Sequence, residues 1–422
     1  MKLSKSRLIF LAPTFLIFFS FLFFIQFKPL SKNSASQNSI KNTIILVSLD
    51  GFRWDYIERT ETPNLDFLIA NGVRAKSLIP VFPSKTFPNH YTIVTGLYAE
   101  NHGIIANTMY DSIFEASFSL GDRNAVAAGR WWGGEPIWVT AEKNNIVTSC
   151  NFWPGSEAEI QGYRPTYWEP YDGDVPNAAR INKTLDYLDI DNMNRPSFYT
   201  LYFSDLDDAG HQYGPDSSGV YPAIQKVDSE IGQLLDGLRE RGILDSVNLM
   251  IVSDHGMSQL SSNRIIYLDD YLIADSLNII NLSPYLDILV ENESVDSIFN
   301  ILNGAHPKMS IYKKPDVPEY LHFSTHNRIP PIIGIADDGW SITTRSHAAE
   351  NTENHAGGTH GYDPFLSSMQ GIFIARGPAF KSGLTVDSFQ NIHLYNLMSW
   401  ILEIESAPND GSLDSLIHIL IK

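Results

Sequence analysis

Four short apolar runs constrain the fold of this chain more than any other feature. They cover residues 43–49, 197–203, 247–253 and 371–375. Runs of this length without alternation are typical of strands that are buried on both faces of a sheet. Helical patterns separate them, at residues 63–70, 86–95, 175–188, 221–241 and 391–402. Strands that alternate with helices predict an α/β fold, in which a central, mostly parallel sheet is flanked by helices on both faces.

The first thirty residues are predicted to form a separate segment. Lys2, Lys5 and Arg7 precede an apolar run from Leu8 to Phe27. A basic start followed by such a run is typical of a signal peptide, and about twenty residues are also enough for a membrane anchor. The flanking positive charges predict that the rest of the chain is exported. The expected location is extracytoplasmic, either periplasmic or secreted, with a membrane tether if the segment is not cleaved.

The rest of the chain is predicted to be a polar linker at residues 31–42 and one large domain at residues 43–422. Residues from about 258 to 345 have weak periodicity and many Asn, Asp and Pro residues, which indicates an inserted lid or subdomain. The formal net charge of -18 at pH 7 disfavours a nucleic-acid polymer as partner. A small phosphorylated substrate is compatible with this charge, because bound cations create a local positive site. Nothing in the sequence indicates an oligomeric state.

Acidic and imidazole side chains follow directly after three of the predicted strands. Asp50 follows the first strand, residues 205–211 follow the second, and the pair Asp254-His255 follows the third. Ligands of such sheets bind outside the carboxyl ends of the strands, so these segments are expected to gather along one edge. Asp207 and His211 are four residues apart, a spacing that brings both side chains to one cation on a helical turn. Each residue taken alone also fits a helix cap, a turn or a solvated group.

Two further segments complete the candidate site. His360 lies among glycines near the last predicted strand, and Thr86 stands at the predicted start of a helix. A helix N-terminus favours an anion because its amide groups are free and its dipole is positive there. Three aspartates and three histidines match the ligand count for two divalent cations. Imidazole plus carboxylate without cysteine favours zinc, and manganese or iron accept the same donors.

Longer motifs surround the candidate site residues. They are Lys85-Thr86-Phe87-Pro88-Asn89-His90, Asn101-His102-Gly103-Ile104, Asn107-Thr108-Met109-Tyr110-Asp111, Trp131-Trp132-Gly133-Gly134-Glu135-Pro136-Ile137-Trp138, Phe152-Trp153-Pro154-Gly155-Ser156, Ser253-Asp254-His255-Gly256-Met257 and Thr359-His360-Gly361-Tyr362-Asp363. With these motifs the chain resembles the nucleotide pyrophosphatase/phosphodiesterase family, which belongs to the alkaline phosphatase superfamily. The similarity runs from about residue 43 to near the C-terminus. It implies an alkaline phosphatase-like fold, in a bacterial-type version that consists of the catalytic domain alone.

The resemblance implies a role for each residue of the candidate site. Thr86 is expected to be the nucleophile, and Asn107 to donate to a non-bridging phosphate oxygen. One of two zinc ions is expected on Asp50, Asp254 and His255, with contact to Thr86. The second zinc ion is expected on Asp207, His211 and His360. Phe87 and Tyr171 are expected to enclose a nucleobase, with Tyr202 as a further candidate for this pocket, although core packing also explains these aromatic residues.

The implied activity is hydrolysis of nucleotide phosphodiester or pyrophosphate bonds through a phosphothreonine intermediate, with release of a nucleoside 5'-monophosphate. A threonine hydroxyl becomes a useful nucleophile when coordination lowers its pKa, which agrees with a two-metal site. The same site also fits a phosphodiesterase for lysophospholipid or choline-phosphate head groups. A sulfatase is disfavoured because it needs Cys or Ser at the position of Thr86. An inactive binding protein of the same fold is disfavoured because Thr86 and all the implied ligands are present.

Overall fold

The computed structural model describes residues 40–350 and 356–421. The predicted leader at residues 1–30 lies outside the described residues, as does the predicted linker apart from Ile40–Asn42, which form a short 3-10 turn. Across the described part of the chain, no helix is both long enough and apolar enough to cross a membrane.

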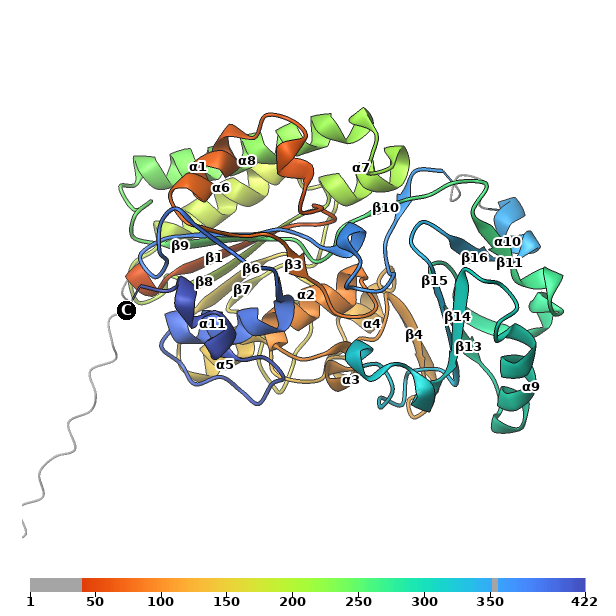
Figure 1. Ribbon diagram of the computed structural model, residues 1–422. Helices are drawn as coiled ribbons and strands as arrows, with labels where there is room; N and C mark the ends of the chain where they lie inside the picture. The colour runs from red at the N-terminus through yellow and green to blue at the C-terminus, as the bar shows by residue number, and fades with distance from the viewer. Residues whose placement is uncertain (1–39, 351–355, 422) are drawn as a thin grey trace, which may run out of the picture. The chain divides into compact units, whose positions relative to one another are not determined.

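A mixed eight-stranded sheet lies at the centre of the described chain (Figure 1). Its strand order is β19-β2-β18-β9-β1-β8-β6-β7. The strands are β1 (Ile44–Leu49), β2 (Val73–Ala75), β6 (Thr148–Asn151), β7 (Tyr167–Trp168), β8 (Phe198–Phe203), β9 (Asn248–Val252), β18 (Phe373–Arg376) and β19 (Leu384–Val386). The five strands from β9 to β7 run parallel, whereas β18 is antiparallel to both of its neighbours. The predicted α/β fold with a mostly parallel sheet is therefore confirmed.

Helices cover both faces of this sheet (Figure 1). One face carries α1 (Pro63–Ala70), α6 (Asn177–Leu188) and α8 (Tyr221–Glu240), and the other carries α2 (Thr86–Thr95), α5 (Ile137–Lys143) and α11 (Leu394–Ile401). Successive residues of β1 pack into opposite layers, Ile45 with the first group of helices and Ile44 with the second. Because both faces are covered, all of β1 is buried, which explains its continuous apolar run.

Short elements connect the two layers around the ends of the strands. They include α3 (Ala99–His102), α4 (Arg123–Val126), α7 (Asp205–Tyr213), the hairpin of β4 (Thr108–Asp111) and β5 (Ala116–Ser119), the pair β3 (Leu78–Ile79) with β20 (Phe389–Gln390), and the pair β10 (Ser258–Gln259) with β17 (Gly358–Thr359). Of these, α7 follows directly after β8 and the β4–β5 hairpin follows α3.

A second, smaller sheet is formed by β12 (Asn278–Asn281), β13 (Tyr285–Leu289), β15 (Ile332–Ala336) and β14 (Met309–Lys313), in that order and all antiparallel. Helix α9 (Asn292–Leu302) packs against β14. The strands β11 (Ile265–Tyr267) and β16 (Ser341–Thr343) form a parallel pair, followed by α10 (Arg345–Glu350). These elements occupy the region of weak periodicity, and they share a hydrophobic cluster of their own. The bounds of the predicted insertion stay a prediction.

Candidate active site

Three neighbouring strands of the central sheet end side by side. Leu49 of β1 pairs with Phe203 of β8, and Ser48 pairs with Val252 of β9. Asp50, the start of α7 and the pair Asp254-His255 follow these ends, so they meet at one edge of the sheet as the strand pattern predicts. Gly51 has a φ of +69°, and a Cβ there would lie 2.9 Å from the Cα of Asp207. A glycine is therefore required for the β1 loop to approach α7 this closely.

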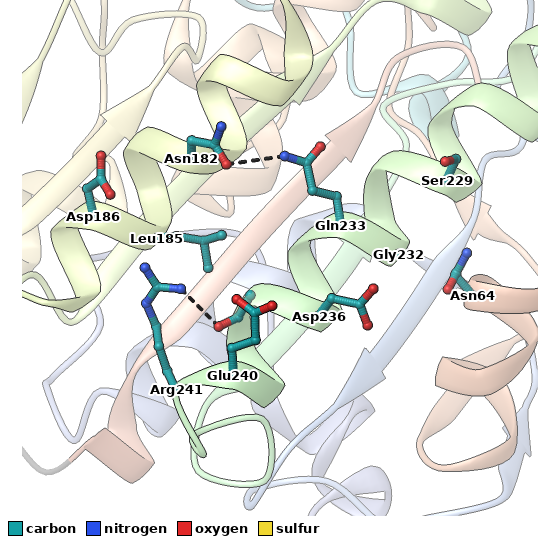
Figure 2. A pocket seen from close by; sticks show the side chains of 11 residues that line it. Asn64, Asn182, Leu185, Asp186, Ser229, Gly232, Gln233, Asp236, Glu240 and Arg241 are labelled. Atoms are coloured by element: carbon teal, nitrogen blue, oxygen red, sulfur yellow. Dashed lines mark hydrogen bonds between the residues drawn. The ribbon is translucent and has the colours of Figure 1, made fainter.

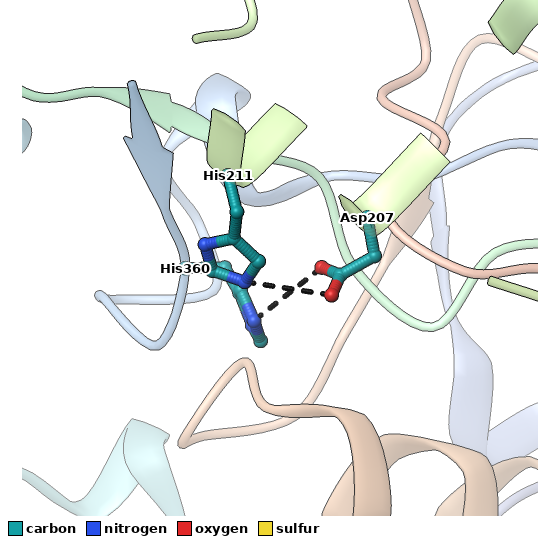
Figure 3. A group of neighbouring side chains, drawn as sticks. All are labelled: Asp207, His211 and His360. Carbon is teal, nitrogen blue, oxygen red and sulfur yellow. Dashed lines mark ion pairs between the residues drawn. The ribbon is translucent and has the colours of Figure 1, made fainter. Parts of the chain in front are cut away.

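The six predicted metal ligands form two groups of three. Asp50, Asp254 and His255 make the first trio, and Asp207, His211 and His360 make the second. Within each trio, the potential ligand atoms lie within 4.8 Å of one another. Figure 3 shows the second trio, in which the Nε2 atoms of His211 and His360 lie 3.4 and 3.6 Å from the Asp207 carboxylate. The rings of His255 and His360 stack with centroids 3.5 Å apart, so the two trios are neighbours.

The hydrogen bonds of the three histidines leave one ring nitrogen of each available. Through Nδ1, His211 donates to the carbonyl of Gly358 (2.8 Å), His255 to that of Gly256 (2.8 Å) and His360 to that of Ser84 (2.9 Å). A carbonyl oxygen only accepts, so Nδ1 carries the proton and Nε2 of the neutral ring keeps a lone pair. Metal-binding histidines are held in this way by their outer-shell partners.

Each of the three carboxylates also leaves one oxygen atom available for a cation. Asp50 Oδ1, Asp254 Oδ2 and Asp207 Oδ1 are buried, and none of them has a hydrogen-bond partner among the residues that the structure describes. A buried acceptor without a partner costs about 1–3 kcal/mol, and more when it is charged. Three such oxygens facing three imidazole nitrogens form a donor set that divalent metals accept. The residues present therefore fit two metal ions.

The electrostatics of the first trio depend on deep burial. Asp50 and Asp254 are each 1% exposed and His255 is fully buried. Burial raises the pKa of Asp50 well above its ordinary value, and the negative charges of Asp254 and Asp207 add to this rise. Burial also opposes ionisation of Asp254, but the electrostatic interactions and hydrogen bonds with His255 and His90 outweigh burial and hold the pKa of Asp254 well below its ordinary value. The uncompensated repulsion on Asp50 is what a bound cation would relieve.

In the second trio, burial together with the charges of His255 and Lys85 holds the pKa of His360 well below its ordinary range. The His360 ring is therefore neutral at pH 7, as a metal ligand must be. Asp205 and Asp208 stand outside both trios. Asp205 pairs instead with Lys226 and Asn177.

Thr86 is the first residue of α2 and lies beside the first trio. Its Oγ1 is 3.3 Å from Nε2 of His255. The next amide, that of Phe87, donates to Oδ1 of Asn107 (3.0 Å). Because the Asn107 oxygen is occupied in this way, its Nδ2 is the atom left for a ligand. Thr86 and Asn107 line the same cavity, with a volume of about 600 Å³.

Aromatic residues line the other part of this cavity, which includes Phe87, Tyr171 and Tyr202. Tyr171 is 38% exposed and packs edge-on against Phe152 (5.2 Å), whereas Phe87 packs against Trp132 (6.0 Å). The hydroxyl of Tyr202 donates to Oδ2 of Asp50 at 2.6 Å, a contact that the sequence did not predict. The aromatic residues thus share one cavity with Asp50 and with all three residues of the second trio.

Sequence reasoning missed His90, which lies beneath the site. Its Nδ1 is 2.9 Å from the Thr86 carbonyl and 3.2 Å from Oδ2 of Asp254, and its Nε2 is 2.8 Å from the Ser48 hydroxyl. His90 therefore connects α2, which begins at Thr86, to the first trio. The signal for it was the four-residue spacing from Thr86, which places both residues on one face of α2.

A second cavity of about 630 Å³ lies between α1, α6 and α8 (Figure 2). Its lining is polar and exposed, with amides such as Asn182 and Gln233, which are joined by a hydrogen bond of 3.2 Å. None of the predicted site residues lines it. Gly232 and Gly237 allow the helices to approach, since a Cβ there would meet Asn64 at 2.7 Å and Leu185 at 2.3 Å. Helix packing accounts for this groove.

Comparisons with known proteins agree with the geometry of the site. A model of the family described as "Type I phosphodiesterase / nucleotide pyrophosphatase" matches residues 44–363. Human ectonucleotide pyrophosphatase/phosphodiesterase family member 5 is 39% identical over 378 residues, which is 89% of this chain and 78% of that protein. Venom phosphodiesterase of Naja atra is 40% identical over 390 residues, 90% of this chain but 46% of that protein.

The solved structures agree in fold. Murine ectonucleotide pyrophosphatase/phosphodiesterase 5 superposes with a TM-score of 0.85 at 37% identity, covering 90% of this chain and 100% of that one. An inactive threonine-to-alanine variant of the same mouse protein, in complex with AMP, superposes equally well, with a TM-score of 0.85. The chain therefore belongs to the type I phosphodiesterase/nucleotide pyrophosphatase family and is a hydrolase of that family.

Proposed function

We propose that the chain is a two-zinc phosphodiesterase that hydrolyses nucleotide phosphodiester or pyrophosphate bonds through a phosphothreonine intermediate on Thr86. The observation that carries this proposal is that Thr86, Asp50 and the second trio line one aromatic-lined cavity. Asp254 and His255 lie directly behind Asp50, and His255 lies 3.3 Å from the Thr86 hydroxyl. The AMP complex of the inactive mouse variant supports a nucleotide as ligand, and a nucleoside 5'-monophosphate as product.

The ligand sets follow the two trios. Asp50, Asp254 and His255, with the Thr86 hydroxyl, would hold one zinc ion, and Asp207, His211 and His360 the other. When bound, the ions would supply Lewis acidity, which neutralises phosphate charge and lowers the pKa of a coordinated hydroxyl. Zinc is favoured over magnesium because half of the ligands are imidazoles.

The chain's own residues carry the rest of the reaction. The Thr86 hydroxyl gives its proton to solvent, and Oγ1 forms a bond to phosphorus while the bond to the leaving oxygen breaks; the leaving group takes up a proton from solvent. Asn107 is held by the Phe87 amide so that its Nδ2 donates to a non-bridging oxygen. A water molecule then attacks phosphorus from the opposite side, the bond to Thr86 breaks, Thr86 regains its proton and the monoester leaves.

Phe87 and Tyr171 would hold the nucleobase between their rings. Tyr202 would line the same pocket and also orient Asp50 through its hydroxyl.

The test compares Thr86→Ala with Thr385→Ala, a control on the exposed edge strand β19. We expect Thr86→Ala to lower turnover of p-nitrophenyl thymidine monophosphate by about 10³-fold or more, with metal content unchanged. Chelation should silence the wild type and zinc should restore it. Near-normal turnover by Thr86→Ala would remove the nucleophile assignment. Turnover of glycerophosphocholine above that of the nucleotide diester would favour the choline-phosphate alternative.

We also propose that residues 1–30 direct export and that the catalytic domain works outside the cytoplasm. The basic, apolar start of the chain and the relatives named as ectoenzymes and venom enzymes support this. Fractionation of cells that express the chain with and without residues 1–30 tests it. The full chain is expected in the membrane or extracytoplasmic fraction, and retention of both forms in the cytoplasm would contradict it.

A further inference from the structure

Asp287 is a buried carboxyl group that the reaction above does not use. It lies in β13 of the second sheet with 0% exposure. None of the ion pairs found among the described residues includes it. Burial raises its pKa to about 7, against the hydrogen bonds that it accepts from Asn281. Burying an acid without a neighbouring cation costs folding free energy. The groups around Asp287 therefore indicate what role offsets this cost.

The Asp287 carboxyl group holds Asn281 twice. It accepts from the Asn281 backbone amide at 2.7 Å and from the side-chain Nδ2 at 2.8 Å. The pairing of β12 with β13 shifts register between Ile279 and Asn281, which frees this backbone amide from the ladder. Such irregularities turn a side chain out of its normal direction.

Asn281 uses its remaining amide proton outside the second sheet. Nδ2 also donates to the carbonyl of Thr108, at 3.0 Å. Thr108 begins β4 and directly follows Asn107, whose own carbonyl accepts from Leu120 at 2.9 Å. The two peptides that flank Thr108 are thus both held, the one from Asn107 by Leu120 at the end of the hairpin and the one that follows by Asn281.

The same strand also contacts the segment that carries the nucleophile. Tyr285 lies two residues before Asp287, on the same face of β13. Its ring packs edge-on against Phe82, with centroids 5.6 Å apart and an interplanar angle of 85°. Phe82 lies four residues before Thr86, and Phe323 closes the cluster at 5.1 Å from Phe82. One face of β13 therefore touches both Phe82 and, through Asn281, the residue after Asn107.

We propose that Asn281, held by Asp287, is a positioning residue that fixes Asn107 relative to Thr86, so that the second sheet takes part in phosphate recognition. This inference rests on the proposed function, in which Asn107 donates to the phosphate. If Asn281 were purely structural, it would only stabilise the register shift between β12 and β13. Replacing it would then lower the stability of the protein and leave the placement of Asn107 unchanged.

A double-mutant cycle separates the two roles. The variants are Asn107→Ala, Asn281→Ala and the double variant, with Asn278→Ala as the matched control, because Asn278 is exposed on the same strand. Each is assayed for kcat and KM on p-nitrophenyl thymidine monophosphate, for metal content and for the urea midpoint of unfolding. Asn281→Ser, whose side chain is too short to reach Thr108, is the second variant of this position.

We expect Asn107→Ala to lower kcat/KM by about 100-fold, as loss of one donor to a developing negative charge does. Asn281→Ala and Asn281→Ser should lower it by about 10-fold, mainly in kcat, with metal content and the Asn278→Ala control unchanged. The double variant should fall within about twofold of Asn107→Ala alone.

Losses that multiply in the double variant, to about 1000-fold, would overturn the proposal, because Asn281 would then act independently of Asn107. Wild-type kinetics with a lowered urea midpoint would overturn it as well. Wild-type activity of Asn107→Ala would show that Asn107 does not donate to the phosphate, and the inference about Asn281 would fail with it. The nucleophile assignment is tested separately by Thr86→Ala.

Discussion

The edge of the central sheet and the second sheet each bury an aspartate, and the two differ in the sign of their pKa shift. Asp254 is 1% exposed and Asp287 is 0% exposed. Interactions with His255 and His90 hold the pKa of Asp254 well below its ordinary value. Burial raises the pKa of Asp287 to about 7, because its hydrogen-bond donors among the described residues are amides and the Tyr285 hydroxyl, which oppose the rise only in part. Burial alone therefore does not mark a metal ligand, and the neighbours decide its role.

The largest expected effect tests the aspartate at the sheet edge. Asp254→Ala removes a charged ligand from the first trio and leaves Asp50 and His255 without it. We expect kcat/KM to fall by about 10³-fold or more and one metal ion per chain to be lost. Kinetics and metal analysis check this against Asp186→Ala, a control in the groove of Figure 2. If Asp254→Ala kept its full metal content, Asp254 would not be a metal ligand and would not differ from Asp287 in this respect.

An intermediate effect is expected from the pH dependence of stability at Asp287. Its pKa is about 7 in the folded chain against an ordinary 3.8, so the folded state binds the proton more tightly. The stability it contributes is complete below about pH 3.8 and is lost as pH rises through about 7. Between pH 5 and 8, the free energy of unfolding of the wild type should therefore fall by about 2–3 kcal/mol relative to Asp287→Asn.

Urea unfolding of both proteins in chelator measures this difference without interference from metal release. Parallel pH profiles for the two proteins would show that Asp287 titrates as an exposed acid does, which would contradict the contrast with Asp254.

The smallest expected effect comes from removing a single hydrogen bond at the sheet edge, the one from Tyr202 to Asp50. Tyr202→Phe keeps the ring in the cavity but removes the hydroxyl that donates to Asp50. We expect kcat/KM to fall about threefold to tenfold, because one such hydrogen bond contributes about 0.5–1.5 kcal/mol net. A loss as large as that of Asp254→Ala would mean that Tyr202 does more than orient Asp50.

The sheet edge was predictable because its signals are local. Parallel strands place their carboxyl ends together, so Asp50 and Asp254 were expected to meet although they lie about two hundred residues apart. The spacing to His211 selected Asp207, and the structure groups these two with His360. The α/β fold and the helix bounds of α1 and α2 also followed from periodicity.

The second sheet was not predictable in detail. The bond from Asn281 to Thr108 joins residues 173 positions apart, and no local pattern signals it. The register shift in β12 depends on how this strand pairs with β13, which composition does not encode. The antiparallel placement of β18 was likewise set by its partners β9 and β2 and not by its own sequence.

Gly51 sets the distance between the end of β1 and α7, because it has no Cβ. A Cβ at this position would lie 2.9 Å from the Cα of Asp207, so the close approach of β1 to α7 depends on its absence. Any larger residue would act as a wedge between β1 and α7 and push the two trios apart. The spacing of the two trios is thus set by the backbone itself.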